Sequence, residues 1–160
     1  MYALTVFAAI GCGLIAGVFF AFSTFVMKAL ADVSTESGVS AMQAINVRVL
    51  GPWFLGAFFG SALACAALLV WSVAQWDGRA SVLLVAGSLS YLLGCFLVTI
   101  AFNVPKNKRL AVLSPSARDT EGPWREYLSK WTFWNHVRTV AAAAAALLYC
   151  LALGTGLGSG

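Results

Sequence analysis

The sequence contains few charged residues, and they are confined to short stretches. Only 10% of its 160 residues are Asp, Glu, Lys or Arg, whereas 61% are hydrophobic. A soluble globular domain has roughly 45–50% apolar and about 25% charged residues. The composition therefore excludes an ordinary soluble domain.

Four stretches lack charged side chains altogether. Each is longer than the roughly 18–20 residues that a helix needs to cross about 30 Å of hydrocarbon. The first has no positively charged start and is too long for a signal peptide, so we expect it to be retained. We predict an all-α, polytopic membrane four-helix bundle forming a single integral membrane domain over residues 1–160. The charge-free stretches are Met1–Met27, Gly51–Gln75, Ala80–Asn103 and the residues after Arg138, and the predicted spans are about 3–27, 53–76, 80–102 and 136–154.

Residues that bind metals or cofactors are also scarce. There is one histidine, His136, and the four cysteines are singletons, one in each predicted span (Cys12, Cys65, Cys95, Cys150). This leaves no ligand set for zinc, copper or iron, and only His136 could ligate a haem. A glycine-rich turn for a nucleotide is also missing. The sequence predicts no cofactor, so an enzyme of this kind would work without one or borrow one.

The net charge of +4 does not indicate a nucleic-acid-binding protein, because no basic stripe or recognition module accompanies it. The basic residues lie instead on one side of the predicted membrane. Only Arg79 falls on the opposite side. By the positive-inside rule we expect a multi-pass protein of the cell (inner) membrane, with both long loops cytoplasmic and both termini outside. The residues on the basic side are Lys28, Arg48, Lys106, Lys108, Arg109, Arg118, Arg125, Lys130 and Arg138.

The first long loop contains a helical pattern of its own. Met42, Ile45 and Val49 recur at helical spacing after Ser40, a plausible N-cap, and a polar, turn-like stretch at Asp32–Val39. We predict a short amphipathic interfacial helix that lies on the membrane surface or over the bundle. Gln43 and Asn46 are three residues apart and would share a face of this helix.

Small residues predict where the spans approach each other closely. Gly13 and Gly17 form one G-x-x-x-G pattern and Gly56 and Gly60 form another, which suits close helix packing in lipid. Such faces serve packing inside one chain equally well as packing in a homo-oligomer or against a membrane partner subunit, and these alternatives stay open.

Prolines indicate two boundaries in the second half of the chain. Pro105 disfavours helix at Val104, so we expect the third span to stop there. From Pro123 a three-to-four spacing of aromatic and polar residues predicts one helix that runs unbroken into the fourth span and ends near Gly154.

The most distinctive stretch is Trp131–Thr139, in which a polar-aromatic cluster precedes an apolar helix. The predicted topology places Gln43, Asn46, Asn103 and Asn107 at the same membrane face. Polar side chains beside hydrocarbon are costly unless satisfied, so we expect one pocket that contains a hydrogen-bond network or a ligand. The candidate catalytic residues are His136 and Asn135, and the candidate substrate-binding residues are Trp131, Trp134, Arg138, Asn46, Gln43, Asn103 and Asn107.

Each of these residues also has a structural interpretation. His136 is a candidate general base, but it would equally cap the network or lie among lipid headgroups. Arg138 would clamp the structure, contact a phospholipid headgroup or bind an anionic substrate. Trp131 and Trp134 are typical of membrane-interface aromatics as well as of surfaces on which a flat ligand stacks. Amides such as Asn46, Asn103 and Asn135 orient ligand oxygens or cap helices.

Four segments together carry a resemblance to a known family. The resemblance covers nearly the whole chain, and the W-x-x-W-N-H-x-R-T block and the N-x-P-x-N segment are its more specific parts. The chain resembles the anthrone oxygenase-like family of small four-helix membrane proteins. Lys28 and Lys106 stand where the family pattern often has proline and leucine. The segments are Phe20–Leu30, Ala41–Asn46, Asn103–Leu110 and Trp124–Thr139.

The resemblance implies an oxygenase that converts an anthrone to an anthraquinone without metal or flavin. A lipophilic anthrone- or quinol-like aromatic would then be the substrate, with His136 removing a proton and Asn46, Asn103 and Asn135 holding the resulting oxyanion. The electron-rich carbanion reacts with dioxygen itself.

The alternative hypothesis is a non-catalytic membrane subunit, or a lipid-binding scaffold of a larger complex. A transporter is disfavoured, because no charged residue lies in the middle of a predicted span.

Overall fold

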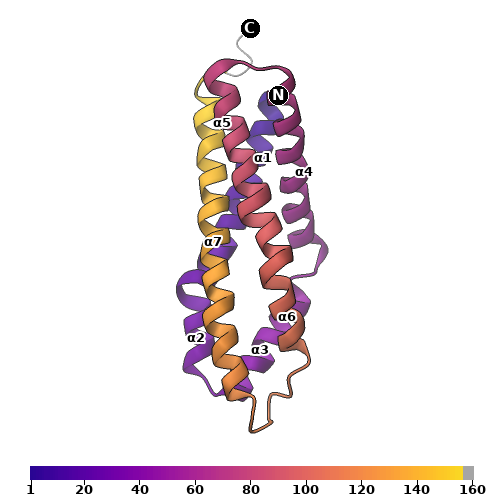
Figure 1. Cartoon of the computed structure of the whole chain (residues 1–160), viewed down its shortest axis with the longest axis vertical. Helices are drawn as coiled ribbons and strands as arrows, with labels where there is room; N and C mark the ends of the chain where they lie inside the picture. The colour runs from indigo at the N-terminus through magenta and orange to yellow at the C-terminus, as the bar shows by residue number, and fades with distance from the viewer. Residues whose placement is uncertain (157–160) are drawn as a thin grey trace.

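The structure is a computed structural model that describes residues 1–156; residues 157–160 of the expected domain lie outside the described part. Four long apolar helices run nearly alongside one another (Figure 1), and the described residues contain no strand. These helices cover Tyr2–Asp32, Pro52–Ala74, Gly78–Ala111 and Glu121–Leu153. The predicted all-α membrane four-helix bundle is confirmed.

The first long helix extends beyond its predicted end. It comprises α1 (Tyr2–Ala21), a π-helical segment η1 (Phe22–Val26) and α2 (Met27–Asp32), and it ends where Val33 adopts extended backbone. The predicted span ends at about residue 27, before Lys28, but the helix continues past this lysine. A charge limits the part of a helix that lies in hydrocarbon, and it does not by itself end the helix.

The predicted amphipathic helix of the first loop is α3 (Thr35–Arg48). Its N-cap is Ser34, whose Oγ accepts a hydrogen bond of 3.2 Å from the backbone N–H of Ser37. The expected N-cap Ser40 and the expected turn before it are therefore wrong, because Ser34 offers a cap six residues earlier. Val39 and Met42 are fully buried or nearly so, and α3 packs against the end of the bundle.

The second and third long helices are joined by a tight turn. α4 covers Pro52–Ala74, and the third helix consists of α5 (Gly78–Leu89), two π-helical segments, η2 (Ser90–Leu97) and η3 (Thr99–Asn103), and α6 (Val104–Ala111). Pro105 does not end this helix, contrary to the expectation. It stands in the first turn of α6, after π-helical hydrogen bonding, at a position where a missing N–H does little harm.

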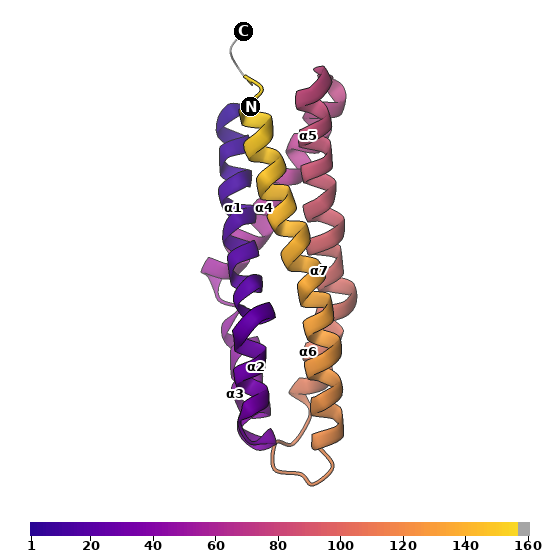
Figure 2. The ribbon, with the colours of Figure 1, turned by 90° about the vertical axis from the view of Figure 1, so that its left-hand side faces the viewer.

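The fourth long helix, α7, covers Glu121–Leu153 without a break and is followed by Gly154. It packs against α1 on one side and against α5 and η2 on the other, while α4 closes the ring between α1 and α5. Figure 2 shows α1 and α7 running along each other, with the start of α1 and the end of α7 at the same end of the bundle.

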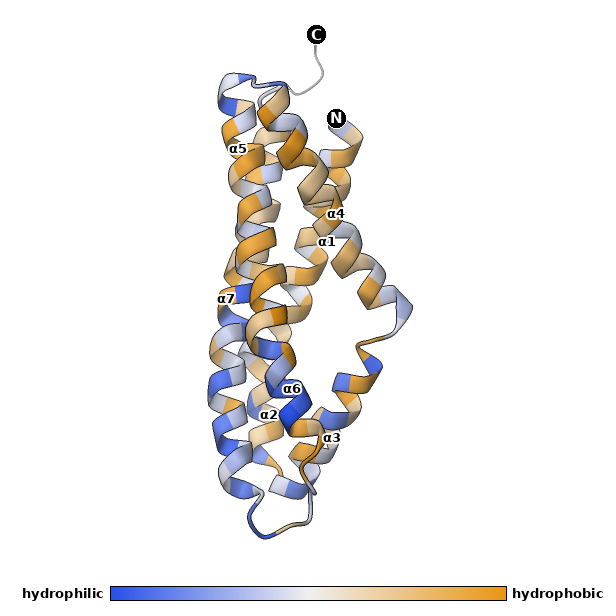
Figure 3. Ribbon diagram, turned by 45° about the vertical axis from the view of Figure 1, so that its right-hand side comes forward, coloured by the Kyte–Doolittle hydropathy of each residue, from blue (hydrophilic) through white to orange (hydrophobic). Residues whose placement is uncertain are grey.

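The helices differ in length in a way that indicates where the membrane lies. α4 has 23 residues, about 34 Å, and is bracketed by the exposed Trp53 and Trp76, as is typical of membrane interfaces. The third helix has 34 residues, about 51 Å, which exceeds the roughly 30 Å of hydrocarbon. The end that contains α2, α3, α6 and the start of α7 therefore extends beyond the Trp53 interface. Figure 3 shows its mixed, more hydrophilic colouring.

Two separate apolar cores stabilise the bundle. The larger lies between α1, α4, α5, η2 and the second half of α7, and includes Ile15, Leu68 and Leu84. The smaller lies between α2, α3, α6 and the first half of α7, and includes Met42 and Trp124. On the first helix, Phe19 belongs to the larger core and Met27 to the smaller, and Ser23 stands between them. The residues at this level make up the polar layer described below.

The closest helix contacts occur at other glycines than those expected. A methyl group added at Gly94 would lie 2.6 Å from Cβ of Ala141 on α7, and one added at Gly11 would overlap Oγ of Ser61 on α4. Gly17 and Gly56, by contrast, have no atom within 4 Å of such a group. The G-x-x-x-G patterns therefore do not mark the tightest packing within this chain.

Candidate functional site

The polar layer between the two cores is centred on Asn135 of α7. This side chain is completely buried, and its Nδ2 donates hydrogen bonds of 2.7 Å to the carbonyl oxygen of Phe19 and to Oγ of Ser23. The Ser23 hydroxyl also lies 3.0 Å from that of Thr139, which donates to the carbonyl oxygen of Asn135. α1, η1 and α7 are therefore joined by polar contacts in the interior of the bundle.

Arg138 extends the layer towards the third long helix. It is only 4% exposed, and it donates a 2.6 Å hydrogen bond to Oδ1 of Asn135 and a 3.3 Å bond to Oγ1 of Thr99. Its Cζ lies 4.0 Å from the ring centroid of Phe19 and 5.1 Å from that of Trp131. No carboxylate pairs with Arg138 anywhere in residues 1–156. Hydroxyl, amide and aromatic groups surround the guanidinium charge in place of a counterion.

Two of the three π-helical segments, η1 and η3, lie at the same level of the bundle. η1 includes Ser23, and η3 begins at Thr99 and ends at Asn103. Such segments alter the α-helical hydrogen-bond pattern and are frequent at functional sites. Side chains hydrogen-bond to carbonyl groups at or just before them, including Asn135 to Phe19, Thr24 to Phe20 and Thr99 to Cys95.

Asn103 completes the layer and leaves polar atoms unsatisfied. It is 1% exposed and its Nδ2 donates a 3.2 Å hydrogen bond to the carbonyl oxygen of Trp131. Its Oδ1 has no partner, and neither does Nε of Arg138. Buried polar atoms are seldom left unpaired. The layer therefore retains one free acceptor and one free donor.

A second group of polar contacts lies just beyond the layer, around Asn107 of α6. Its Oδ1 accepts hydrogen bonds of 2.9 Å from the Tyr127 hydroxyl and 2.7 Å from Nε1 of Trp131. The Tyr127 hydroxyl in turn accepts a 3.5 Å bond from Nδ2 of Asn46 on α3. α3, α6 and α7 are thereby tied together.

Two further candidates have structural environments away from this network. Nε2 of Gln43 donates to the carbonyl oxygens of Leu110 and Leu113, at 2.9 and 3.0 Å, and so fixes α3 to the end of α6. Trp134 is half-buried and stacks on Phe102 with ring centroids 3.6 Å apart.

His136 does not join the asparagines in a common pocket. It is exposed, although its neighbour Asn135 is completely buried. It lines a groove of about 410 Å³ between the first long helix and α7. Apolar side chains such as Met27 and Leu128 line this groove together with the polar residues Ser23, Lys28, Ser129 and Thr132. The expected single pocket containing both the imidazole and the amides is therefore wrong.

Ser23 is the residue that connects the groove to the polar layer. It lines the groove, is 9% exposed, and accepts the hydrogen bond from Asn135. Asn135 in turn accepts from Arg138, so two hydrogen bonds lead from the buried guanidinium to the wall of the groove.

The structure brings some candidates together and separates others. One connected region contains Asn135, Arg138, Asn103, Trp131 and Asn107. Asn46 is joined to it through Tyr127. His136, Trp134 and Gln43 lie outside it. The site residues predicted from the sequence do not include Ser23, Thr99 and Tyr127, although Ser23 and Thr99 are visible as hydroxyl residues inside charge-free runs.

These features define a small polytopic membrane protein with a buried polar layer and a lateral groove near one membrane interface. A family model described as "Anthrone oxygenase" matches residues 51–148, which is more than half of the chain. The chain belongs to this anthrone oxygenase family. No curated protein and no solved structure matches it.

Proposed function

We propose that the protein is a membrane oxygenase that oxidises a lipophilic phenolic aromatic of the anthrone class, with His136 as the general base. The observation that carries the proposal is the position of the only histidine of the chain, which lines a groove that combines apolar and polar side chains. The family membership supports the reaction class.

The groove has the chemical character that such a substrate requires. Its volume of about 410 Å³ falls within the roughly 300–1,000 Å³ typical of small-molecule sites. Met27, Ala31 and Leu128 offer apolar contact to the rings, and Phe133 offers an aromatic one. The ammonium group of Lys28 and the hydroxyls of Ser129 and Thr132 suit a phenolate oxygen. A molecule dissolved in the bilayer reaches this groove from the side.

In the proposed reaction His136 accepts a proton from the methylene carbon between the two rings. The resulting carbanion is delocalised into the neighbouring carbonyl as an oxyanion, which Lys28 and the hydroxyl groups stabilise. The carbanion transfers electrons to dioxygen and forms a C–O bond, and the peroxide takes up the proton. Loss of the second methylene proton and cleavage of the O–O bond release water and leave a carbonyl group. The methylene and one dioxygen thus become one carbonyl and one water.

The polar layer has a positioning role in this proposal. Arg138 polarises Asn135, which donates to Ser23 at the wall of the groove. Ser23 is thereby held in one orientation beside the substrate, and the positive charge of Arg138 favours an oxyanion there. The third long helix and α3 are kept in register with α7 by Asn103, Asn107, Asn46 and Trp131. The same end of the bundle is supported by Gln43 and Trp134.

The second candidate function is a non-catalytic membrane subunit. The dense packing of the polar layer favours it, because Asn135 finds all its hydrogen-bond partners within the protein. Such a layer fixes helix register without any ligand.

The experiment is an oxidation assay on the purified full chain in lipid nanodiscs with 1,8-dihydroxyanthrone. Dioxygen uptake and anthraquinone absorbance are measured against empty nanodiscs, which report uncatalysed oxidation. General-base catalysis typically contributes 10²–10⁴-fold, so His136→Gln should lower the rate at least about 100-fold. Arg125→Gln, an exposed change elsewhere on α7, is the matched control and should keep the full rate.

Three outcomes would count against parts of the proposal. A wild-type rate equal to that of empty nanodiscs rejects oxidation of this substrate class and favours the non-catalytic subunit. A full rate in folded His136→Gln rejects the base. A rate that survives in His136→Gln but falls in Asn103→Ala would relocate the reaction to the buried layer.

A further inference from the structure

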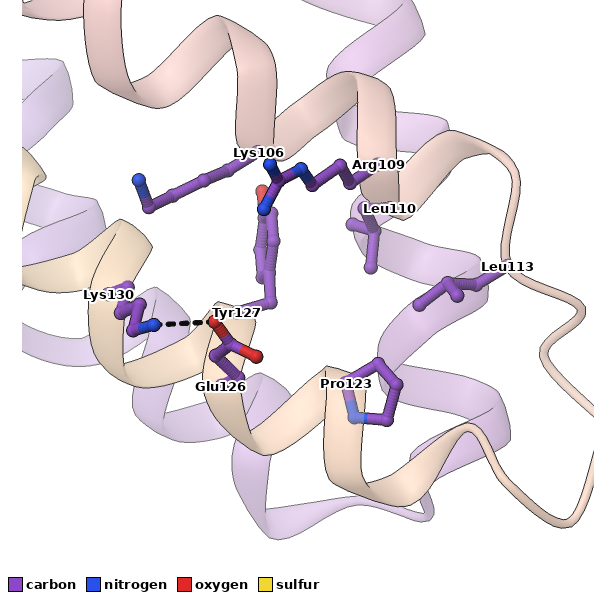
Figure 4. Close-up of a pocket in the computed structure, with 8 residues that line it drawn as sticks. All are labelled: Lys106, Arg109, Leu110, Leu113, Pro123, Glu126, Tyr127 and Lys130. Atoms are coloured by element: carbon purple, nitrogen blue, oxygen red, sulfur yellow. Dashed lines mark hydrogen bonds and ion pairs between the residues drawn. The ribbon is translucent and has the colours of Figure 1, made fainter.

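A second cavity lies at the end of the bundle beyond the Trp53 interface, apart from the His136 groove. It has a volume of about 220 Å³ and lies between α6 and the first half of α7. Figure 4 shows Lys106 and Arg109 reaching into it from α6, and Glu126, Tyr127 and Lys130 from α7. None of these five side chains lines the His136 groove.

The charges around this cavity are unbalanced. Three cations line it, against a single carboxylate. Glu126 is already engaged, since Nζ of Lys130 lies 2.6 Å from its Oε1. Lys106 donates to the carbonyl oxygen of Phe102, and neither Lys106 nor Arg109 pairs with a carboxylate within the described range 1–156. Two positive charges thus face the same space without counterions.

The remaining walls are apolar or aromatic. Leu110 and Leu113 line one side, and the buried Tyr127 lines another. The volume is below the roughly 300–1,000 Å³ of sites for drug-sized ligands, so the cavity suits a compact charged group attached to something apolar. Arginine and lysine are the residues that commonly bind phosphate oxygens, arginine often in a bidentate manner.

The height of the cavity in the bundle agrees with such a ligand. Trp53 stands in the first turn of α4 and Trp76 lies two residues beyond its end. About as many residues after Gly78 as separate these two tryptophans bring the third helix to Phe102. Lys106 lies four residues further, or about 6 Å, and Arg109 about 10 Å. The polar headgroup region is about 5–8 Å thick on each side of the hydrocarbon. Lys106 therefore lies within the headgroup region, where the lipid phosphates are, and Arg109 lies just beyond it.

We infer that this cavity is a binding site for the phosphate group of an anionic membrane lipid, held by Lys106 and Arg109. The phosphate takes the place of the missing carboxylates, and the first part of the lipid glycerol and acyl chain lies along Leu110 and Tyr127. A bound lipid bridges α6 and α7 and so stabilises the end of the bundle that extends beyond the membrane core.

The test uses the delipidated full chain in a neutral detergent. Its thermal unfolding midpoint is followed during titration with phosphatidylglycerol, phosphatidylcholine or inorganic phosphate, each in the same detergent. Phosphatidylglycerol should raise the midpoint saturably, while phosphatidylcholine should do so at least tenfold less effectively. Inorganic phosphate should have no effect at millimolar concentration.

Matched variants separate a specific site from general surface charge. The double variant K106Q/R109Q should bind phosphatidylglycerol at least tenfold more weakly. K108Q/R125Q removes the same charge from residues that do not line the cavity and should change binding less than twofold. Arg109→Lys keeps the charge and should stay within about threefold of the wild type. All of these side chains are at least partly exposed, and each variant's midpoint without lipid reports its folding.

Each contrary result overturns the inference in a different way. Equal weakening in the two double variants means that phosphatidylglycerol responds only to net charge. Equal stabilisation by both lipids means that the cavity does not select a lipid with a net negative charge. Saturable stabilisation by inorganic phosphate, lost in K106Q/R109Q, would assign the cavity to free phosphate in place of a lipid. None of these readouts depends on oxidation at His136.

Discussion

Arg138 and Asn135 lie one helical turn apart on α7 and are joined by a 2.6 Å hydrogen bond in the interior of the bundle. Asn135 is fully buried and Arg138 is 4% exposed. Because no carboxylate among the described residues balances the guanidinium, its charge depends on the oxygens of Asn135 and Thr99 and on two aromatic rings. The two residues should therefore act as a unit in stability.

The first prediction concerns the two members of this pair. Asn135→Ala removes the acceptor of a buried charge, and we expect it to lower the free energy of unfolding by about 2–3 kcal/mol. Arg138→Met should cost less, because an apolar side chain of similar length replaces a desolvated charge. Unfolding in detergent would measure both changes.

The double variant and a surface control complete this test. Asn135→Ala/Arg138→Met should cost less than the sum of the two single changes, since the pair is already broken by either one. Arg125→Ala breaks an exposed ion pair with Glu121 and should cost about 0–1 kcal/mol. Strict additivity of the two buried changes would contradict the coupling.

A second prediction concerns the hydrogen bonds around Asn107. Its Oδ1 accepts from both Tyr127 and Trp131, so Asn107→Ala leaves two donors without their partner. Each unsatisfied group costs about 1–3 kcal/mol when buried. Tyr127→Phe removes only one of the two donors, and Oδ1 of Asn107 keeps the bond from Trp131. The one group that loses an acceptor is Nδ2 of Asn46, whose bond is long at 3.5 Å, so the change should cost about 1 kcal/mol. We expect the order of stability to be wild type, Tyr127→Phe, Asn107→Ala.

The matching observable is the fluorescence of Trp131, whose indole N–H loses its acceptor only in Asn107→Ala. A shift of its emission in Asn107→Ala but not in Tyr127→Phe, read in a background with the other tryptophans replaced by phenylalanine, would support this assignment. Equal destabilisation by the two changes would contradict it.

The sequence was sufficient to predict the architecture, for a simple physical reason. Charge-free runs longer than a bilayer is thick have few alternatives to spanning helices. The helix ends were harder to predict, because Lys28 and Pro105 mark limits of hydrophobicity or of one hydrogen-bond pattern and not of helical backbone. A π-helical segment ends shortly before Pro105, so the proline's missing N–H does little harm to the helix. Nothing in the local sequence specifies that π-helical segment.

The candidate site was predicted in part, and the error at His136 is instructive. Consecutive residues of a helix point about 100° apart, so Asn135 and His136 do not both face the interior. The spacing of Trp131, Asn135 and Arg138 follows the three-to-four pattern of one face, and His136 does not belong to it. The partners Ser23 and Thr99 came from helices whose relative rotation the sequence leaves undetermined.

A third prediction concerns the contact between the third long helix and α7. Gly94→Ala introduces a methyl group 2.6 Å from Cβ of Ala141, so one of the helices must shift. Overpacking of this kind typically costs about 1–3 kcal/mol. Gly56→Ala is the matched control, because its new methyl group meets no atom within 4 Å and alanine favours helix over glycine by about 1 kcal/mol.

We expect Gly94→Ala to lower the unfolding midpoint in detergent and Gly56→Ala to leave it unchanged or raise it. Loss of stability in Gly56→Ala would instead indicate that the α4 face is covered by another chain, since no contact inside this one opposes the change.

The last prediction concerns the orientation in the membrane. Most of the basic residues lie at the end of the bundle that carries the two long connections, whereas the opposite end has only Arg79, at the start of α5. The positive-inside rule predicts that the long loops are cytoplasmic and that both termini are outside. The start of α1 and the end of α7 lie together at the opposite end of the bundle (Figure 1). In a background with all four cysteines replaced by alanine, Thr155→Cys should react with a membrane-impermeant maleimide in intact cells, and Ser116→Cys should react only after permeabilisation. Both positions are exposed, so burial does not decide the labelling. The reverse pattern would place the Lys106–Arg109 cavity on the outer side, and with it the lipid leaflet that supplies its ligand.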